Sequence, residues 1–573
     1  MKSTIATVIL AIAAVAGAVA VGFAQLGSDF FFAGNLLVSR SVYDNNPANV
    51  RAGDSLPPGC AQPNCQAANN DGTYPYVWNN DLVDSSFGIT SKIFLDQMTP
   101  DGTLVNSLEV PNSSQRGVPP TKDQLVTSFP SKSELALNLS TDGRFVTFIG
   151  YVAPIDAIDI SNSNTPDIVD PTNPVPGLSF RAVAQIDQHG KFQFTKTEAY
   201  SGNNGRAAIL NNSSGAGVMY LAGNAGNGGD PQPDDIIIAA GAQIMSPDVR
   251  AMVAQSPGLP TPVGSFNIKQ LPGAKYQAGD KLGKDTNFRG MTIFDQVLYY
   301  TKGSGGNGIN TVYFVDTTGL ACPTTTTGGV VTNGGVGVPQ TMSPGFAGLP
   351  TSPIVYDIND VSSQGIVPYN MCVLNGFPID LKTKTSFPFG LWFADANTLY
   401  VADEGDGDAT FDTVSKTYTN AVVDAAGKTK ANVLPGLQKW VFDGTKWNRK
   451  YTLQAGLKLG LPYAYVIAGY PTGNNDAKTL QTGKPAPWTP ATGGLRNITG
   501  RVNGDGTVTI WAITSTVSGN GDTGADPNQL VMITDTLSAL TLPADESFAI
   551  VRKAGFGEVL RGVSFTPGTS SSH

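Results

Sequence analysis

Four arginines could act together because each occupies the same place in a repeated pattern. Arg206, Arg289, Arg496 and Arg561 each begin a strand-like segment that leads into a short polar turn and a second strand. Guanidinium groups hold carboxylates or phosphates through paired, charge-assisted hydrogen bonds. If the segments surround a common channel, the arginines converge at its rim, and we predict that they bind an anionic ligand there.

The alternative is that each arginine pairs with a carboxylate at the end of a neighbouring strand. Asp44, Asp403 and Glu404 are the candidates for such pairs. A buried ring of like charges is costly without partners, which favours this interpretation. Two further copies of the pattern carry Glu134 and Gly390 in place of arginine, so an anion site would be asymmetric.

An acidic run with interspersed glycines follows one predicted strand. Calcium prefers several carboxylate and carbonyl oxygens on a bendable loop. The alternative is a solvated acidic turn, because the run does not match the full calcium-binding loop pattern. The candidate metal ligands are Asp403, Glu404, Asp406 and Asp408.

The chain has too few histidines to support histidine-based chemistry. The only two histidines are His189, in a predicted turn, and His573 at the C-terminal end. Histidine metal sites and Ser-His-Asp catalysis therefore find no support. No pattern indicates a nucleotide, flavin or haem, and we identify no catalytic residue.

The composition indicates many short strands joined by turns. The 573 residues include 66 glycines and 39 prolines, and only 14% are charged. Most apolar runs are short and rich in Val, Ile, Tyr and Phe, as expected of strands. The net charge of -9 argues against nucleic-acid or anionic-membrane partners, which would be repelled.

One hairpin outline, two apolar strands around a short polar turn, occurs six times. Asp395-Ala396-Asn397 is the turn of its clearest copy. The last copy is split between the two ends of the chain. The copies are Glu134–Tyr151, Arg206–Asn224, Arg289–Gly303, Gly390–Glu404, Arg496–Ser515, and Arg561–Pro567 with Leu36–Val42.

Each hairpin is followed by a loop and a second strand pair. About six sets of four antiparallel strands are typical of a β-propeller, and a blade shared by both termini would close the ring. We therefore predict an all-β, six-bladed propeller within one domain, residues 25–573. A seventh blade in residues 328–360 and a pair of β-sandwich domains are the alternatives.

Strand direction sorts the connections onto two faces. The turns within strand pairs, such as 140–143 and 503–506, are short, whereas the connections on the other face, such as 44–88 and 405–435, are long. Long loops on a rigid scaffold commonly carry binding residues. We expect ligands at the long-loop face, with the arginines, and no role for the short turns.

The N-terminal residues 1–24 have the features of a secretory signal peptide. Lys2 precedes an apolar run, and small residues surround the expected cleavage after Ala24. An uncleaved anchor helix is the alternative, and no later segment is apolar enough to span a membrane. The sequence thus predicts a secreted or periplasmic protein.

Four cysteines in an oxidising compartment are expected to form disulfides. Proximity favours the pairs Cys60–Cys65 and Cys322–Cys372, although four cysteines allow three connectivities. Their spacing does not suit a zinc site.

The phrase Leu399-Tyr400-Val401-Ala402-Asp403 resembles a strand of the NHL-repeat, gluconolactonase and strictosidine-synthase-like propellers. The resemblance implies a propeller fold. In the lactonases a metal is held at the channel mouth by acidic and Asn residues, and here Asp403 and Glu404 stand at a comparable strand end.

Two functions follow as expectations. The first is a secreted, monomeric binding or scaffold propeller whose long-loop face and channel mouth hold a polysaccharide, a peptide or an envelope protein. The alternative is a Ca²⁺-dependent hydrolase of the lactonase or phosphoesterase type, in which a metal polarises the substrate and arginines stabilise negative charge.

Overall fold

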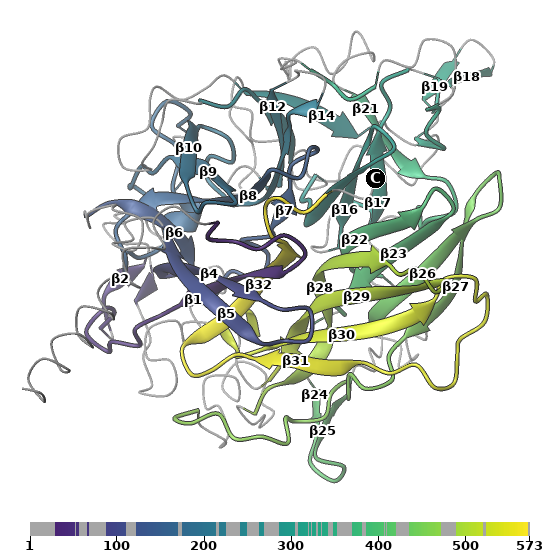
Figure 1. Cartoon of the computed structure of the whole chain (residues 1–573). Coiled ribbons are helices and arrows are strands. Elements are labelled where there is room, and N and C mark those ends of the chain that lie inside the picture. The colour runs from purple at the N-terminus through teal and green to yellow at the C-terminus, as the bar shows by residue number, and fades with distance from the viewer. Residues whose placement is uncertain are drawn as a thin grey trace, which may run out of the picture.

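The structure is a computed structural model in which β-strands dominate (Figure 1). In the described part, the helical elements are two short 3₁₀ turns, η3 (Ile160–Asn162) and η6 (Thr523–Ala525). The described residues are 29–51, 53–56, 66–67, 88–110, 122–169, 173, 175–213, 217–224, 241–248, 263–268, 286–303, 308–318, 320–321, 324–327, 330–333, 335–341, 348–351, 369–380, 386–405, 407, 410–419, 435–470, 489–518 and 523–570.

Two nine-stranded sheets form one part of the ring. The first has the order β10 (Phe192–Thr197), β9 (Arg181–Asp187), β8 (Phe145–Ala153), β6 (Gln124–Ser128), β4 (Thr90–Met98), β1 (Leu36–Val42), β32 (Glu558–Phe565), with β5 (Leu104–Val110) beside β4 and β7 (Asn138–Leu139) beside β8. The second has the order β11 (Gly205–Asn211), β12 (Val218–Gly223), β13 (Ala242–Met245), β14 (Val263–Ile268), β21 (Tyr369–Leu374), β17 (Thr311–Val315), β16 (Val297–Lys302), β15 (Gly290–Phe294), with β20 (Val336–Gly337) beside β21.

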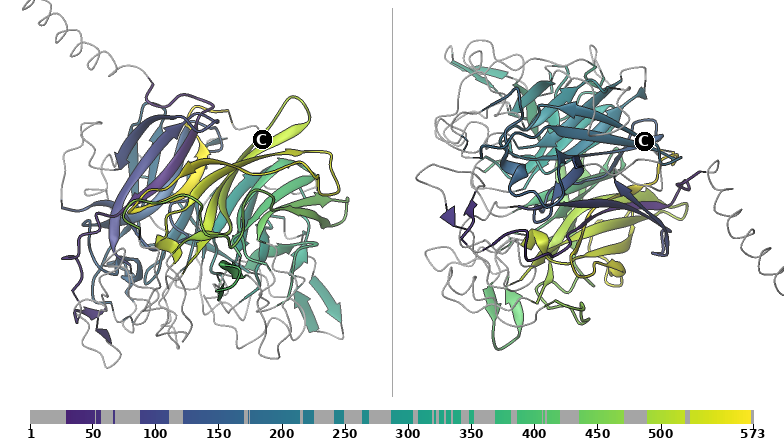
Figure 2. Two further views of the ribbon diagram at one scale, coloured as in Figure 1. Left: turned by 90° about the horizontal axis from the view of Figure 1, so that it is seen from below. Right: turned by 90° about the vertical axis from the view of Figure 1, so that its left-hand side faces the viewer.

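Two four-stranded sheets complete the propeller-like arrangement, and small strand pairs lie outside it (Figures 1 and 2). The four-stranded sheets are β22 (Pro388–Asp395), β23 (Thr398–Asp403), β26 (Gly436–Phe442), β27 (Trp447–Leu453), and β28 (Ala491–Val502), β29 (Thr507–Val517), β30 (Gln529–Thr536), β31 (Ala549–Lys553). The small pairs are β2 (Ser55–Leu56) with β3 (Gln66–Ala67), β18 (Thr324–Thr327) with β19 (Val330–Asn333), and β24 (Thr410–Asp412) with β25 (Thr417–Thr419).

The number of separate large sheets in the described chain is four, not the six blades predicted. The difference arises where neighbouring strand sets share edge hydrogen bonds. β4 pairs with β6 through only Thr90 and Ser91, and β14 runs parallel to β21 over Asn267 and Ile268. These short pairings join strand sets that sequence patterns treat as separate.

The predicted pairing of the two ends of the chain is confirmed. β1 runs antiparallel to β32, from Leu36 opposite Phe565 to Val42 opposite Glu558, with one irregularity after Ser39. The other predicted hairpins are also present, as β7–β8, β11–β12, β15–β16, β22–β23 and β28–β29. Alternating apolar residues and short polar turns were sufficient signals for all of them.

The hydrophobic core lies between neighbouring sheets rather than within one layer. Phe294 of β15 stacks on Phe393 of β22 with ring centroids 4.6 Å apart. Trp511 of β29 meets Phe565 of β32 edge-on at 5.6 Å. Because large aromatic rings fill these interfaces, each sheet depends on its neighbours for burial.

A fully buried ion pair joins the two four-stranded sheets. The Lys439 Nζ lies 2.9 Å from the Asp535 Oδ2, and neither side chain is exposed. The ammonium also donates to the Tyr451 hydroxyl at 2.9 Å and to the Thr536 carbonyl at 2.8 Å. Tyr400 and Tyr451 donate their hydroxyl protons to the same carboxylate. The pair is thus saturated with hydrogen bonds, as buried charges require.

We expect the protein to be more stable near pH 5 than near pH 8. Burial raises the pKa of Asp156 and Asp403 to about 6 and that of Glu198 and Glu546 to about 7. The folded state therefore keeps protons that the unfolded chain loses at about pH 4, so stability falls as pH rises through these values. Melting temperatures across this range test it, and Glu546→Gln should flatten the upper part of the profile. A melting temperature that rises from pH 5 to 8 would contradict the expectation.

The predictions for the N-terminus and for three cysteines concern residues outside the described ranges. Residues 1–24, Cys60, Cys65 and Cys322 fall there. Cys372 in β21 is disulfide-bonded, and its pairing with Cys322 stays a prediction. Among the described residues, no helix is both long and apolar enough to cross a membrane.

Candidate functional site

The first strands of the hairpins approach one another closely at the centre of the ring. The Ala136 amide donates to the Arg206 carbonyl at 3.2 Å, and the Val563 amide donates to the Asn497 side chain at 2.7 Å. Glycines permit the closest approaches. At Gly290, a Cβ atom would lie 2.2 Å from the Phe389 carbonyl oxygen. At Gly390 it would lie 2.5 Å from the Arg496 carbonyl oxygen, and at Gly562 2.3 Å from the Leu135 carbonyl oxygen.

All four predicted arginines lie buried at one end of this central region. Arg206 is 4% exposed, Arg289 6%, Arg496 4% and Arg561 4%. Arg289 and Arg561 contact the same segment, and the charge of Arg289 lies close enough to those of Arg206 and Arg496 to act on both. What they contact decides their role.

Arg561 and Arg289 hold the segment Phe129–Glu134, which we call the plug segment. Arg561 donates to the carbonyl oxygens of Phe129 and Ser131 and, through Nε, to the Ser41 hydroxyl at 3.2 Å. Arg289 donates to the Ser133 hydroxyl. Side chains from separated strands thus fix the plug segment beside the buried arginines.

The other two arginines also meet protein acceptors. Arg206 donates to the Phe288 carbonyl at 2.6 Å and to the Asn287 side chain. The Arg496 Nε lies 3.3 Å from the Glu404 carboxylate. Of the carboxylates proposed as alternative partners, Glu404 is therefore the one in contact with a predicted arginine among the described residues.

Glu404 sits in a cationic environment. Its second oxygen accepts from Lys132 of the plug segment at 3.3 Å. Burial alone would raise the pKa of Glu404, but Lys132, Arg289 and Arg496 together hold that pKa below its ordinary value. The carboxylate stays ionised and helps to fix the plug segment.

Glu134, which replaces arginine in the second hairpin, serves the same segment differently. Its carboxylate accepts from the Thr127 hydroxyl at 2.6 Å, the Ser128 amide at 2.9 Å and the Tyr151 hydroxyl at 2.6 Å. An Asn204 side-chain amide completes the set at 3.4 Å. These bonds satisfy a buried acid without a direct ion pair.

Asp403 is bound within its own sheet. One oxygen accepts from the Ser386 hydroxyl, the Phe387 amide and the Gln438 amide at 3.1, 2.9 and 2.9 Å, and the other accepts from the Gly405 amide at 3.0 Å. The carboxylate therefore already has four donors.

The described residues contain no group of three or more His, Cys, Asp or Glu side chains placed to hold a metal. Asp406 and Asp408 lie outside the described ranges, so the calcium site stays a prediction.

A cavity of about 420 Å³ occupies the centre of the ring on the side away from the arginines. Its deep end lies at Gly290 and Gly390, next to the arginine level. Its mouth is bordered by the short turns at Ser140–Thr141 and Asp295–Gln296. This size is typical of small-molecule sites.

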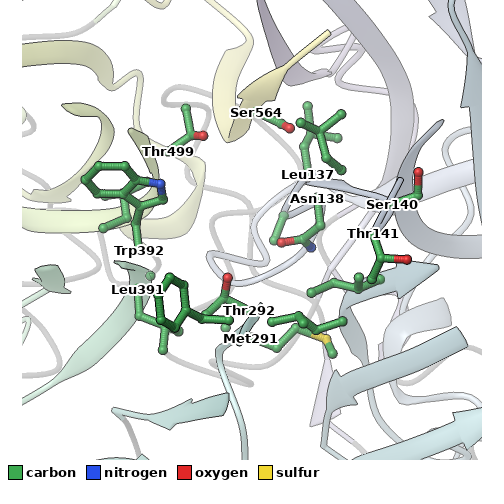
Figure 3. A pocket seen from close by; sticks show the side chains of 18 of the residues that line it. Leu137, Asn138, Ser140, Thr141, Met291, Thr292, Leu391, Trp392, Thr499 and Ser564 are labelled. Atoms are coloured by element: carbon green, nitrogen blue, oxygen red, sulfur yellow. The ribbon is translucent and has the colours of Figure 1, made fainter. Parts of the chain in front are cut away.

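The cavity combines apolar walls with separated polar groups (Figure 3). Leu391 and Trp392 form one wall, while Asn138, Thr292 and Thr499 extend into the same space from other strands. In the described structure the hydroxyls of Thr292 and Thr499 have no hydrogen-bond partner, and both residues are partly accessible. Accessible hydroxyls in a mostly apolar cavity can orient a ligand.

Sequence reasoning missed this cavity because it assigned function to the other face. It expected no role for the short turns, yet Ser140 and Thr141 line the cavity. A usable signal was present. A hydroxyl residue follows three positions after an arginine in three hairpins, as Thr292, Thr499 and Ser564.

Comparisons with known proteins give little. No family model matches the chain, and the search of curated proteins found no match. The solved structures that match include an ACO/RPE65 chimera and a single-residue variant of that chimera in a trigonal crystal form. Identity is 8% in both, with TM-scores of 0.20 and 0.21. The matches cover 83% and 84% of this chain but only 59% of the length of those chains. The resemblance to NHL-repeat and gluconolactonase propellers is not confirmed.

Proposed function

We propose that this protein is a non-enzymatic binding propeller that holds a small ligand in its central cavity. The observation that carries the proposal is the pair of accessible hydroxyls, Thr292 and Thr499, on β15 and β28, the two strands that flank the apolar wall of β22. Thr292 pairs with Tyr299 and Thr499 with Trp511 in antiparallel strand pairs, which favours a preformed site. Preformed apolar cavities with a few oriented polar groups are the usual form of ligand sites.

The same proposal includes a closed ring of six blades. Each nine-stranded sheet would comprise two blades joined by the short pairings at β4–β6 and β14–β21. Support comes from the six first strands, which contact one another in turn through the glycine approaches and hydrogen bonds at the centre. Secretion after removal of residues 1–24 and a monomeric state complete the proposal.

Filling the cavity should abolish small-molecule binding without unfolding the protein. We expect Thr499→Trp to weaken binding of neutral fragments at least about tenfold, because the indole would occupy the space. Ligand-detected NMR with a neutral fragment library measures this effect. Thr103→Trp is the matched control, since Thr103 is exposed and outside the cavity. Fragments that bind equally to both variants would contradict the cavity as the site.

The arginine end supports a second proposal, binding of an anionic group. Arg206 and Arg289 each keep a buried Nε without an acceptor, and four arginines with Lys132 face only two carboxylates among the described residues there. A phosphate or carboxylate would balance this charge. We favour the cavity because every predicted arginine already bonds to protein groups. The hydrolase alternative is weaker still, because Asp403 has four donors within its own sheet.

Replacing Arg289 and Arg561 together by Ala tests the anion proposal. We expect the affinity for inorganic phosphate to fall by more than about 2 kcal/mol, because two charge-assisted bonds are lost. Stability should fall as well, since the plug segment loses its anchors. Titration on a variant shown to be folded separates the two effects. Undiminished phosphate affinity there would remove the anion site.

A further inference from the structure

The charge of the cavity lining restricts the ligand. Among the described residues, Asp295 is the only ionisable one in that lining, and it lies in the turn at the mouth. A charged ligand would lose its hydration on entering the cavity and would find no opposite charge inside, which is costly. The interior therefore suits a neutral molecule.

The polar groups surround the cavity instead of gathering at one wall. Thr292, Thr499 and Ser564 come from β15, β28 and β32, and Asn138 comes from β7. Ser564 donates its proton to the Phe565 carbonyl at 3.0 Å, and Asn138 donates from Nδ2 to the Ala208 carbonyl at 3.1 Å. Their oxygens remain as acceptors, while Thr292 and Thr499 can donate or accept. This distribution suits a ring that carries hydroxyls on several sides.

The walls between these groups are apolar. Leu137, Met291, Leu391 and Trp392 face the cavity (Figure 3). Gly500 lies against the Trp392 ring, where a Cβ atom would be 2.6 Å from the indole. The indole is thus held in place, and it offers flat apolar surface to a ligand ring.

The strands that line the cavity crowd together at its deep end. Close backbone approaches at Gly290 and Gly390 narrow the centre, and the plug segment lies beyond them, fixed by Arg289 and Arg561. A ligand must enter past the short turns at Ser140–Thr141 and Asp295–Gln296. A chain could insert only its end.

We propose that the cavity binds a neutral cyclic polyol, such as a sugar ring. Where the ring is the terminal unit of a chain, the chain enters end-on from the short-turn face. The proposal rests on the cavity being the ligand site of the binding function above, and it names the chemistry and direction of that binding.

Calorimetry on the mature protein tests the ligand class. The probes are glucose, galactose, mannose, xylose and myo-inositol, with glucuronate as a charged ring of matched size and 2-naphthol as a neutral aromatic alcohol. We expect at least one neutral polyol to bind and glucuronate not to bind. Thr292→Val with Thr499→Val should weaken that polyol about tenfold, because two neutral hydrogen bonds are lost, whereas Thr103→Val should not.

The direction of entry has its own control. Linear maltohexaose and α-cyclodextrin contain the same six units, but the cyclic form has no ends. We expect the linear form to bind more tightly, and equal or tighter binding of the cyclic form overturns end-on insertion.

The remaining outcomes separate the two proposals. If 2-naphthol binds and is lost in Thr499→Trp while no polyol binds, the ligand class is wrong and the cavity function stands. If no probe binds, both proposals fail.

Discussion

We expect that removing residues 559–573 leaves a protein that does not fold. The deletion takes all of β32 except its first residue, and β32 is the hydrogen-bonded partner of β1. Val559, Leu560, Val563 and Phe565 lose their places in the core. Burial of four such side chains is worth about 6–12 kcal/mol, comparable to the whole stability of a domain. Circular dichroism and thermal melting of the truncated protein measure the effect.

A point substitution gives the matched control. Val563 in β32 is 1% exposed, whereas Val105 in β5 is 40% exposed. Val563→Asp should unfold the protein because it buries a charge without a partner, and Val105→Asp should change the melting temperature little. A truncated protein that melts as the full chain does would disprove the dependence on the terminal strand pair.

Asp535→Ala should lower the free energy of unfolding by about 3–5 kcal/mol. The substitution leaves the ammonium of Lys439 fully buried without its carboxylate, and the hydroxyls of Tyr400 and Tyr451 lose their acceptor. Both sides of the contact between the two four-stranded sheets are affected. Denaturant unfolding followed by tryptophan fluorescence measures the loss.

Two comparisons show whether the buried charge is the cause. Replacing both partners, Lys439→Met with Asp535→Leu, should recover much of the loss, because apolar groups can substitute for a buried pair. Removing the partly exposed pair Lys92–Glu109, 3.2 Å apart, should cost less than about 1 kcal/mol. A loss below about 1 kcal/mol for Asp535→Ala would show that water or rearrangement compensates the lysine.

Local signals predicted the strands well because they depend on neighbouring residues. The turn Asp395–Asn397 correctly predicted the hairpin around it. The pairing of the two terminal strands was predicted because Arg561–Pro567 repeats the opening of other hairpins. The number of separate sheets was not predictable in this way. It depends on the two-residue pairings of Thr90 and Ser91 with β6, which leave no periodic pattern.

The contacts of the four arginines could not be predicted from the sequence. Strand direction predicts that Arg289 and Arg561 lie on the same face, and in the structure both contact the plug segment. Their acceptors lie in the plug segment, whose sequence Phe-Pro-Ser-Lys-Ser-Glu carries no strand or motif signal. Carbonyl acceptors of this kind are invisible in a sequence because every residue has one.

The glycines at the centre make the diameter of the ring independent of the side chains that line its interior. At Gly290, Gly390 and Gly562 backbone meets backbone, so the spacing of the strands does not depend on any side chain that faces the cavity. Thr292 and Thr499 can therefore be exchanged for other residues without moving the scaffold. Relatives of this protein could diverge in ligand preference while keeping the same framework, and a designer could retune its selectivity at these two positions alone.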